Sequence, residues 1–165
     1  MSPAKRASDR SYWLMKSEPD EVSIDDLARA PRQILPWTGV RNYQARNFMR
    51  DGMQPGDGVL FYHSSCPEPG VAGLATIASR TAPDTTQFDA TSPYFDAKSK
   101  PDAPRWLQID VQLERKTRLV SLAEMRQAPD LATMLVLKRG NRLSITPVTA
   151  AEWQAVIQRL GRQAL

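Results

Sequence analysis

The chain has 165 residues, 41% of them hydrophobic and 24% charged, a balance typical of one soluble globular domain with a sizeable core. Its 22 Lys and Arg exceed its 18 Asp and Glu, and this mild excess permits contact with nucleic acid without requiring it. The single cysteine, Cys66, excludes an internal disulfide framework and fits a reducing compartment. No apolar run is long enough to span a membrane. We therefore expect no membrane contact and a cytoplasmic location, or a nuclear one if the source is eukaryotic.

The N-terminal part of the chain changes character after the first ten residues. MSPAKRASDR contains no hydrophobic segment, so we expect a disordered tail over residues 1–10 and one domain over residues 11–162. The apolar run Tyr12–Met15 predicts a buried strand. Ser23, followed three residues later by Asp26, predicts the start of a short helix, because both side chains suit the capping of a first turn.

The segment 37–50 (WTGVRNYQARNFMR) combines aromatic residues, two asparagines and three arginines without a single acid. Trp37 stands between a proline and a Thr-Gly pair, which predicts that its ring lies on a turn. The pattern over Asn42–Arg50 predicts a helix, on which Arg46 and Arg50 share a face. Arginines beside an exposed flat ring suit a partner that is both anionic and planar. The segment therefore predicts a surface that binds nucleic acid.

The middle of the chain predicts two strands and a long loop. Pro and Gly residues within Gln54–Gly58 predict a turn, after which Val59–Tyr62 and Val71–Ser79 are expected to be strands. Residues 80–104 are rich in Pro, Asp, Thr and Ser, but Tyr94 and Phe95 within them should be buried. We therefore expect a long ordered loop, and loops of this length are usually functional.

The second half of the chain contains the clearest strand pattern. Residues Trp106–Leu113 alternate between apolar and polar side chains, which predicts a half-buried antiparallel strand. Arg142–Thr146 predicts a further strand, whereas Leu131–Leu137 is ambiguous between helix and strand. Two short helices are predicted where a hydroxyl precedes a glutamate by three residues, at Ser121 and at Thr149.

Short strands at this spacing, with short capped helices between them, predict an α+β domain built on a small curled β-barrel. Long helices do not alternate with strands, and the chain contains no Gly-rich phosphate loop of the familiar types, which argues against a dinucleotide-binding fold. With one histidine and one cysteine the chain offers almost no ligands for a catalytic zinc site. We expect no metal and no cofactor.

Six motifs in this order and spacing resemble the EVE domain, over nearly the whole chain. They are YWLMKSEP at 12–19, WTGVRNYQARNFMR at 37–50, GDGVLFYHS at 56–64, SPYFD at 92–96, PRW at 104–106 and GNRLSITPV at 140–148. The resemblance implies a PUA-like fold related to the YTH readers of methylated adenine. It also implies recognition of a modified base, mainly modified cytosine (5-methyl or 5-hydroxymethyl) in DNA, by base flipping and without catalysis.

The resemblance carries a set of expected site residues. In the related readers a tryptophan stacks on the flipped base, and the matching position is Trp37. Asn42 matches the polar residue that meets the base edge. Further base-contacting candidates, from the ends of two strands, are Lys16, Ser17, Tyr62, His63 and Ser64.

Four arginines are expected to bind phosphate, which would add affinity without base information. They are Arg41, Arg46, Arg50 and Arg142. The expected partner is nucleic acid, modified DNA or alternatively RNA, bound by a monomer.

Each assignment has a structural alternative. Trp37 is a possible core aromatic, the arginines a solvated face paired with nearby acids, Asn42 a helix cap, and His63 a hydrogen-bonded residue at a strand end. For the whole protein the alternatives are a PUA-like module that reads modified RNA, a nucleotide-processing enzyme, and a protein-interaction adaptor. Turnover would identify the enzyme, whereas a reader returns its ligand unchanged.

Overall fold

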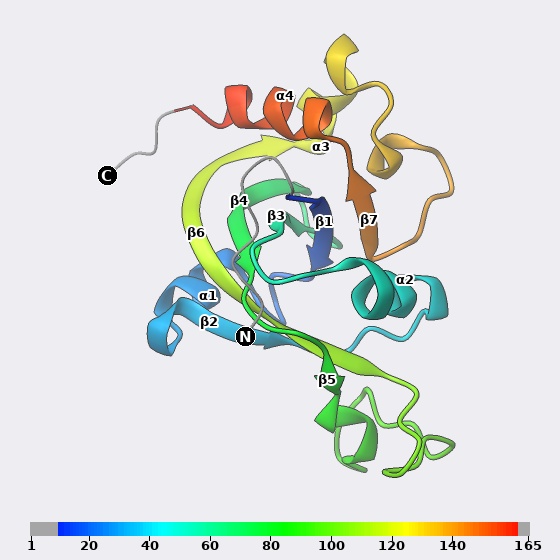
Figure 1. Ribbon diagram of the computed structural model, residues 1–165. Coiled ribbons are helices and arrows are strands. Elements are labelled where there is room, and N and C mark those ends of the chain that lie inside the picture. The colour runs from blue at the N-terminus through cyan, green and yellow to red at the C-terminus, as the bar shows by residue number, and fades with distance from the viewer. Residues whose placement is uncertain (1–9, 162–165) are drawn as a thin grey trace.

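The computed structural model describes residues 10–161, and it forms one curled mixed sheet with helices packed on both of its faces (Figure 1). The strands are β1 (Tyr12–Ser17), β2 (Ile34–Trp37), β3 (Gly58–His63), β4 (Gly70–Ile77), β5 (Ala82–Pro83), β6 (Leu107–Ser121) and β7 (Ile145–Val148). The helices are α1 (Ile24–Arg29), α2 (Tyr43–Asn47), α3 (Leu122–Arg126) and α4 (Ala150–Leu160). Single tighter or wider turns occupy Pro31–Gln33, Phe48–Gly52, Thr85–Phe88, Pro129–Leu131 and Leu135–Leu137.

The sheet runs in the order β2-β6-β4-β3-β1-β7, with β5 paired to β6 beside this path. Strands β1 and β3 are parallel, and the other neighbours are antiparallel. The pairing of β4 with β6 shifts register twice, and such irregularities increase the bend of a strand. Figure 1 shows the result, a long β6 that bends around the sheet with α4 against its outer side.

The expected barrel is wrong in one respect, because the sheet is curled but open. Its two edges are β2 and β7, which do not pair with each other. Each edge strand carries a proline, Pro36 in β2 and Pro147 in β7. Proline cannot donate a ladder hydrogen bond, so it belongs on an edge and works against closure of the sheet.

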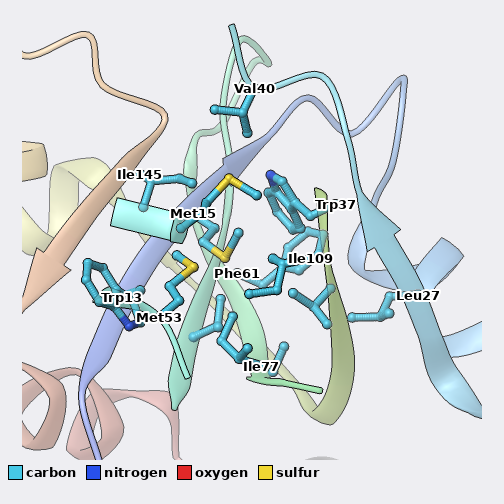
Figure 2. Packing of buried hydrophobic residues seen from close by; sticks show 14 of the residues in the cluster. Trp13, Met15, Leu27, Trp37, Val40, Met53, Phe61, Ile77, Ile109 and Ile145 are labelled. Carbon is cyan, nitrogen blue, oxygen red and sulfur yellow. The ribbon is translucent and has the colours of Figure 1, made fainter. Parts of the chain in front are cut away.

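Side chains alternate between two buried clusters on opposite faces of the sheet. Trp13, Met15 and Phe61 enter the cluster that also contains α1 and α2 residues, which Figure 2 shows. Leu14 and Leu60 enter the other cluster, beneath α3 and α4. Both faces of β1 and β3 are therefore covered, which explains why Tyr12–Met15 and Val59–Tyr62 are continuously apolar. Within residues 10–161, no helix is long and apolar enough to cross a membrane.

The helix starts agree with the capping patterns. Ser23 with Asp26, and Thr149 with Glu152, each form a reciprocal capping box. Ser121 caps α3 through its hydroxyl, which accepts from the Glu124 N–H. The Glu124 carboxylate does not complete a box, because it accepts from Arg118 instead.

The strand predictions were accurate in the middle of the chain and less so elsewhere. The alternating strand from residue 107 is confirmed and continues to Ser121, while β7 begins at Ile145, so that Arg142 precedes it. The ambiguous segment 131–137 contains two single turns. Within the predicted loop 80–104, Tyr94 is half-buried but Phe95 is 44% exposed.

The predicted disordered tail falls mostly on residues 1–9, which lie outside the described residues. Arg10, counted there as its last residue, donates from Nε to the Gly56 carbonyl at 2.9 Å and lies over the rings of Tyr12 and Trp153. Residue 162, the expected domain end, also lies outside the described part.

Candidate functional site

A cavity of about 660 Å³ opens where the sheet ends, at the exits of β1 and β2 and the entry of β7. Its remaining walls come from the end of β3, from Val111 of β6, and from the segments around residues 18–27 and 86–94. The residues used below, all of which line it, are Lys16, Ser17, Glu18, Glu21, Leu35, Trp37, Gly39, Ser64, Tyr94, Val111, Arg142 and Ser144. A cavity of this volume, lined by both apolar and polar residues, is typical of a site for a small organic group.

Trp37 belongs both to the core and to the cavity wall. It is the last residue of β2 rather than a turn residue, and only 9% of it is exposed. Its ring meets Phe61 edge to face, with centroids 5.3 Å apart, and Figure 2 shows both rings within the buried cluster. The prediction of a turn was wrong because Leu35 and Trp37 pair with β6, a contact across more than 70 residues.

Tyr94 forms a further aromatic part of the wall, which the sequence reasoning did not assign to the site. Its ring lies so close to Gly39 that an added Cβ there would be 2.9 Å from the ring, and Gly39 has φ +84°. The Tyr94 hydroxyl donates to the Glu21 carboxylate. Burial and this carboxylate raise the pKa of Tyr94 to about 12, so the hydroxyl stays protonated at neutral pH. The signal was present in the SPYFD motif.

Arg41 holds this wall in place instead of remaining free for phosphate. Its guanidinium donates to the Asp84 carboxylate at 3.0 Å and to the Tyr94 carbonyl at 2.7 Å and 3.0 Å, and it also donates to the Thr86 hydroxyl. Asp84 is fully buried and accepts a further hydrogen bond from the Gly39 N–H at 2.8 Å. The expected phosphate ligand is thus a structural hub, because a buried carboxylate needs a partner.

Three polar residues from the predicted set also line the cavity. Ser17 lines it while its hydroxyl donates to the Val22 carbonyl at 2.6 Å, and Ser64 lines it after the end of β3. Lys16 is half-buried, and burial lowers the pKa of its ammonium group. Among residues 10–161, the Lys16 ammonium makes no hydrogen bond or ion pair. An unpaired, partly desolvated donor in a cavity is ready to bind an acceptor.

Two predicted base contacts lie elsewhere. Tyr62 points into the second cluster, because it is one residue from Phe61 and adjacent side chains on a strand face opposite sides. His63 accepts a hydrogen bond at Nε2 from the Ile24 N–H at 3.1 Å, at the start of α1. Burial lowers the pKa of His63, which favours the neutral ring that this acceptor role requires. Neither residue lines the cavity.

The remaining predicted residues of segment 42–50 are also used locally. Asn42 accepts from the Ala45 N–H at 3.1 Å and so caps α2. Arg46 donates to the Arg105 carbonyl and to Asn47, and it lies 4.7 Å from the centre of the Tyr43 ring. Arg50 pairs with its neighbour Asp51. These residues do not line the cavity, so the predicted helix exists but does not present a free basic face.

Arg142 differs from the other three arginines. It is exposed, lines the cavity and has no ion pair within the described part of the chain. The structure thus brings together Trp37, Lys16, Ser17, Ser64 and Arg142, and it separates them from the other predicted residues.

The profile of the EVE domain matches residues 11–159, nine-tenths of the chain. The chain belongs to this family. It is 43% identical to thymocyte nuclear protein 1 of Homo sapiens over 165 residues, covering 89% of this chain and 72% of that protein. All residues that line the cavity lie within the matched EVE domain.

Two solved structures place the EVE fold more precisely. The human THYN1 protein in complex with 5-methylcytosine-containing DNA superposes with a TM-score of 0.84 at 42% identity, covering 93% of this chain and 99% of that one. The YTH domain of the Zygosaccharomyces rouxii MRB1 protein, in complex with N6-methyladenosine RNA, gives a TM-score of 0.57 at 11% identity, covering 100% and 94%. The second likeness shows the fold alone.

Proposed function

We propose that this EVE domain is a reader of DNA that takes a flipped modified cytosine, 5-methyl or 5-hydroxymethyl, into the cavity beside Trp37. The observation that carries the proposal is the cavity itself, which is lined by a tryptophan and by a lysine whose ammonium group has no partner within residues 10–161. It is supported by the human relative, whose structure contains 5-methylcytosine DNA. The curled sheet shared with a YTH domain supports a PUA-like origin of the fold.

The charged residues that line the cavity can form hydrogen bonds with the polar edge of a cytosine base. The Lys16 ammonium can only donate hydrogen bonds, while the carboxylates of Glu18 and Glu21 can only accept them. Cytosine carries an exocyclic amino donor where thymine carries a carbonyl acceptor. A wall that offers both a cation and carboxylates can therefore satisfy cytosine, and it leaves a carboxylate facing the thymine carbonyl.

Magnitudes indicate where selectivity must come from. Extrusion of a base costs a few kcal/mol, and stacking on one aromatic ring returns roughly 1 to 3 kcal/mol, so the two terms nearly cancel. Burial of one added methyl group contributes about 0.8 kcal/mol, which is about fourfold in affinity. Burial alone therefore gives only a weak preference. A strong preference needs either a tight pocket around the methyl group, for which Leu35, Trp37 and Val111 are available, or a polar group matched to the hydroxyl of a hydroxymethyl group.

The test is equilibrium binding at one stated salt concentration, with matched DNA and RNA oligonucleotides that carry unmodified, methylated or hydroxymethylated cytosine, or methylated adenine. Trp37→Leu keeps apolar volume but removes the ring face, and we expect it to weaken binding of the preferred form by about 5- to 150-fold, the loss of one stack. The control is Trp153→Leu, which removes a tryptophan of similar burial from the opposite face of the sheet.

The outcomes separate the possible functions. Preference for modified cytosine in DNA, lost with Trp37→Leu and kept with Trp153→Leu, supports the reader. Preference for RNA would favour the RNA-binding alternative, and recovery of chemically altered oligonucleotide would favour an enzyme. Equal weak binding of every oligonucleotide by wild type and Trp37→Leu would overturn the proposal.

A further inference from the structure

The segment between the last single turn and β7 is strongly basic. Residues 138–142 (KRGNR), here named the basic loop, contain three cations and no acid, and all three side chains are exposed. Within residues 10–161 none of the three makes an ion pair or a side-chain hydrogen bond. Figure 1 shows this segment as the orange connection that leads into β7.

The basic loop is held in one shape by its asparagine. Asn141 donates from Nδ2 to the Leu135 carbonyl at 2.8 Å and accepts at Oδ1 from the Leu143 N–H at 3.0 Å. Its own N–H donates to the Lys138 carbonyl, which closes the turn, and Gly140 has φ +80° with open space around it. The backbone is therefore bonded, while the cationic side chains are left available to a ligand.

The basic loop is also next to the cavity. Arg142 and Ser144 line the cavity, and the Ser144 carbonyl accepts from the Lys16 N–H at 2.8 Å. The strand that bears Lys16 thus fixes the position of the loop relative to the pocket. A nucleotide whose base enters the cavity must carry its phosphates past the rim, and this rim bears unpaired cations.

We propose that the basic loop binds consecutive phosphates of the DNA strand whose base occupies the cavity, through Lys138, Arg139 and Arg142. This rests on the proposed function. It keeps Arg142 from the predicted phosphate contacts, replaces the three arginines of segment 41–50, and adds Lys138 and Arg139. The turn closed between Lys138 and Asn141 keeps the three cations near one another, and each charge is carried on a long, exposed side chain that can reach a separate phosphate. Three cations on this loop can therefore meet three phosphates.

The experiment is the salt dependence of DNA binding by the full chain. The variant Lys138→Gln/Arg139→Gln/Arg142→Gln removes the three charges, and we expect the slope of log affinity against log salt to fall in magnitude by about 2.7 on duplex DNA, or about 2.1 on a single strand. Because phosphates carry no base information, methylated and unmodified oligonucleotides should lose affinity by the same factor.

Two matched variants test whether position or charge alone is responsible. Arg32→Gln/Lys100→Gln/Arg126→Gln removes the same charge from exposed cations that do not line the cavity, and it should change the slope much less. Lys138→Arg/Arg139→Lys/Arg142→Lys keeps the charge of the loop and should keep the wild-type slope. Thermal unfolding of each variant shows whether it is folded.

Failure of this inference is distinguishable from failure of the reader function. If wild type prefers the modified base but the basic-loop variant keeps the wild-type slope, or if the two triple charge removals act equally, the loop does not bind phosphate and the reader stands. If the slope falls as expected while wild type shows no preference among bases, the loop binds DNA and the reader function is wrong.

Discussion

Two arginine-rich segments of this chain differ in whether their arginines are bonded within the fold. Segment 41–50 has the more suggestive sequence, yet Arg41 is bonded to a buried carboxylate and Arg46 to a backbone carbonyl. The basic loop at 138–142 is shorter and less conspicuous, and its cations are left without partners in the described chain. The difference teaches that an arginine is available to a ligand only if the fold has supplied no acceptor for it. The sequence gives the number of charged residues, whereas the tertiary contacts determine how many of them remain available to a ligand.

The sharpest way to break this comparison is to remove one arginine from each segment. Arg41→Gln leaves the fully buried Asp84 without its ion pair, and we expect the free energy of unfolding to fall by about 3 kcal/mol or more. Arg142→Gln removes an exposed, unpaired side chain and should change it by less than about 0.5 kcal/mol. Urea denaturation measures the free energy of unfolding of both variants. Equal losses would show that Arg41 is no more important to stability than Arg142.

A smaller effect tests whether Asn42 acts in the fold or on a base. Asn42→Ala removes the cap of α2 and should cost about 1 kcal/mol of stability without changing the preference for a modified base. Asn42→Asp is the control, since aspartate caps equally well. If Asn42→Asp keeps the stability but loses the base preference in oligonucleotide binding, that result would support the prediction that Asn42 contacts the base edge.

The smallest expected effect is the pH dependence of stability that His63 contributes, because its ring accepts a hydrogen bond at the start of α1. Burial lowers the pKa of His63 from its usual 6.5, so the unfolded chain takes up this proton at higher pH than the folded chain does. Its contribution to stability is therefore complete above about pH 6.5 and declines as the pH falls from there towards the lowered pKa. His63→Gln keeps an acceptor for the Ile24 N–H but does not titrate in this range.

We expect the loss of stability on acidification from pH 7.5 to 5 to be shallower in His63→Gln than in wild type, as measured by denaturant unfolding at each pH. Identical pH profiles would show that His63 does not titrate differently in the folded and unfolded chains.

Local patterns were sufficient wherever a feature depends on neighbouring residues. The capped helix starts at Ser23 and Thr149, and the alternating strand from residue 107, follow from contacts within a few positions or from a simple period. The edge strand β2 was missed because it is only four residues long and includes Pro36, so its pairing with β6 rather than its own pattern makes it a strand.

The residues of the candidate site were likewise predicted only in part from the sequence. Motif resemblance predicted Trp37, Lys16, Ser17 and Ser64, and positive charge predicted Arg142; these five residues line one cavity. It could not separate Tyr62 from its neighbours, because one step along a strand reverses the direction of a side chain and both faces of this sheet are buried. Tyr94 was placed in a functional loop but not in the site.

By itself the sequence determined the family, the capped helix starts and the strands with a strong apolar pattern, since these depend on residue identity and short-range order. Only the tertiary structure decided that the sheet stays open, that Trp37 ends an edge strand at a cavity, and which cations remain free. Those properties arise from pairing between residues far apart in the chain: β2 with β6, Arg41 with Asp84, and Lys16 with Ser144. A polar group that forms a hydrogen bond within the fold is no longer available to a ligand. The polar groups that remain unpaired therefore indicate where a ligand can bind.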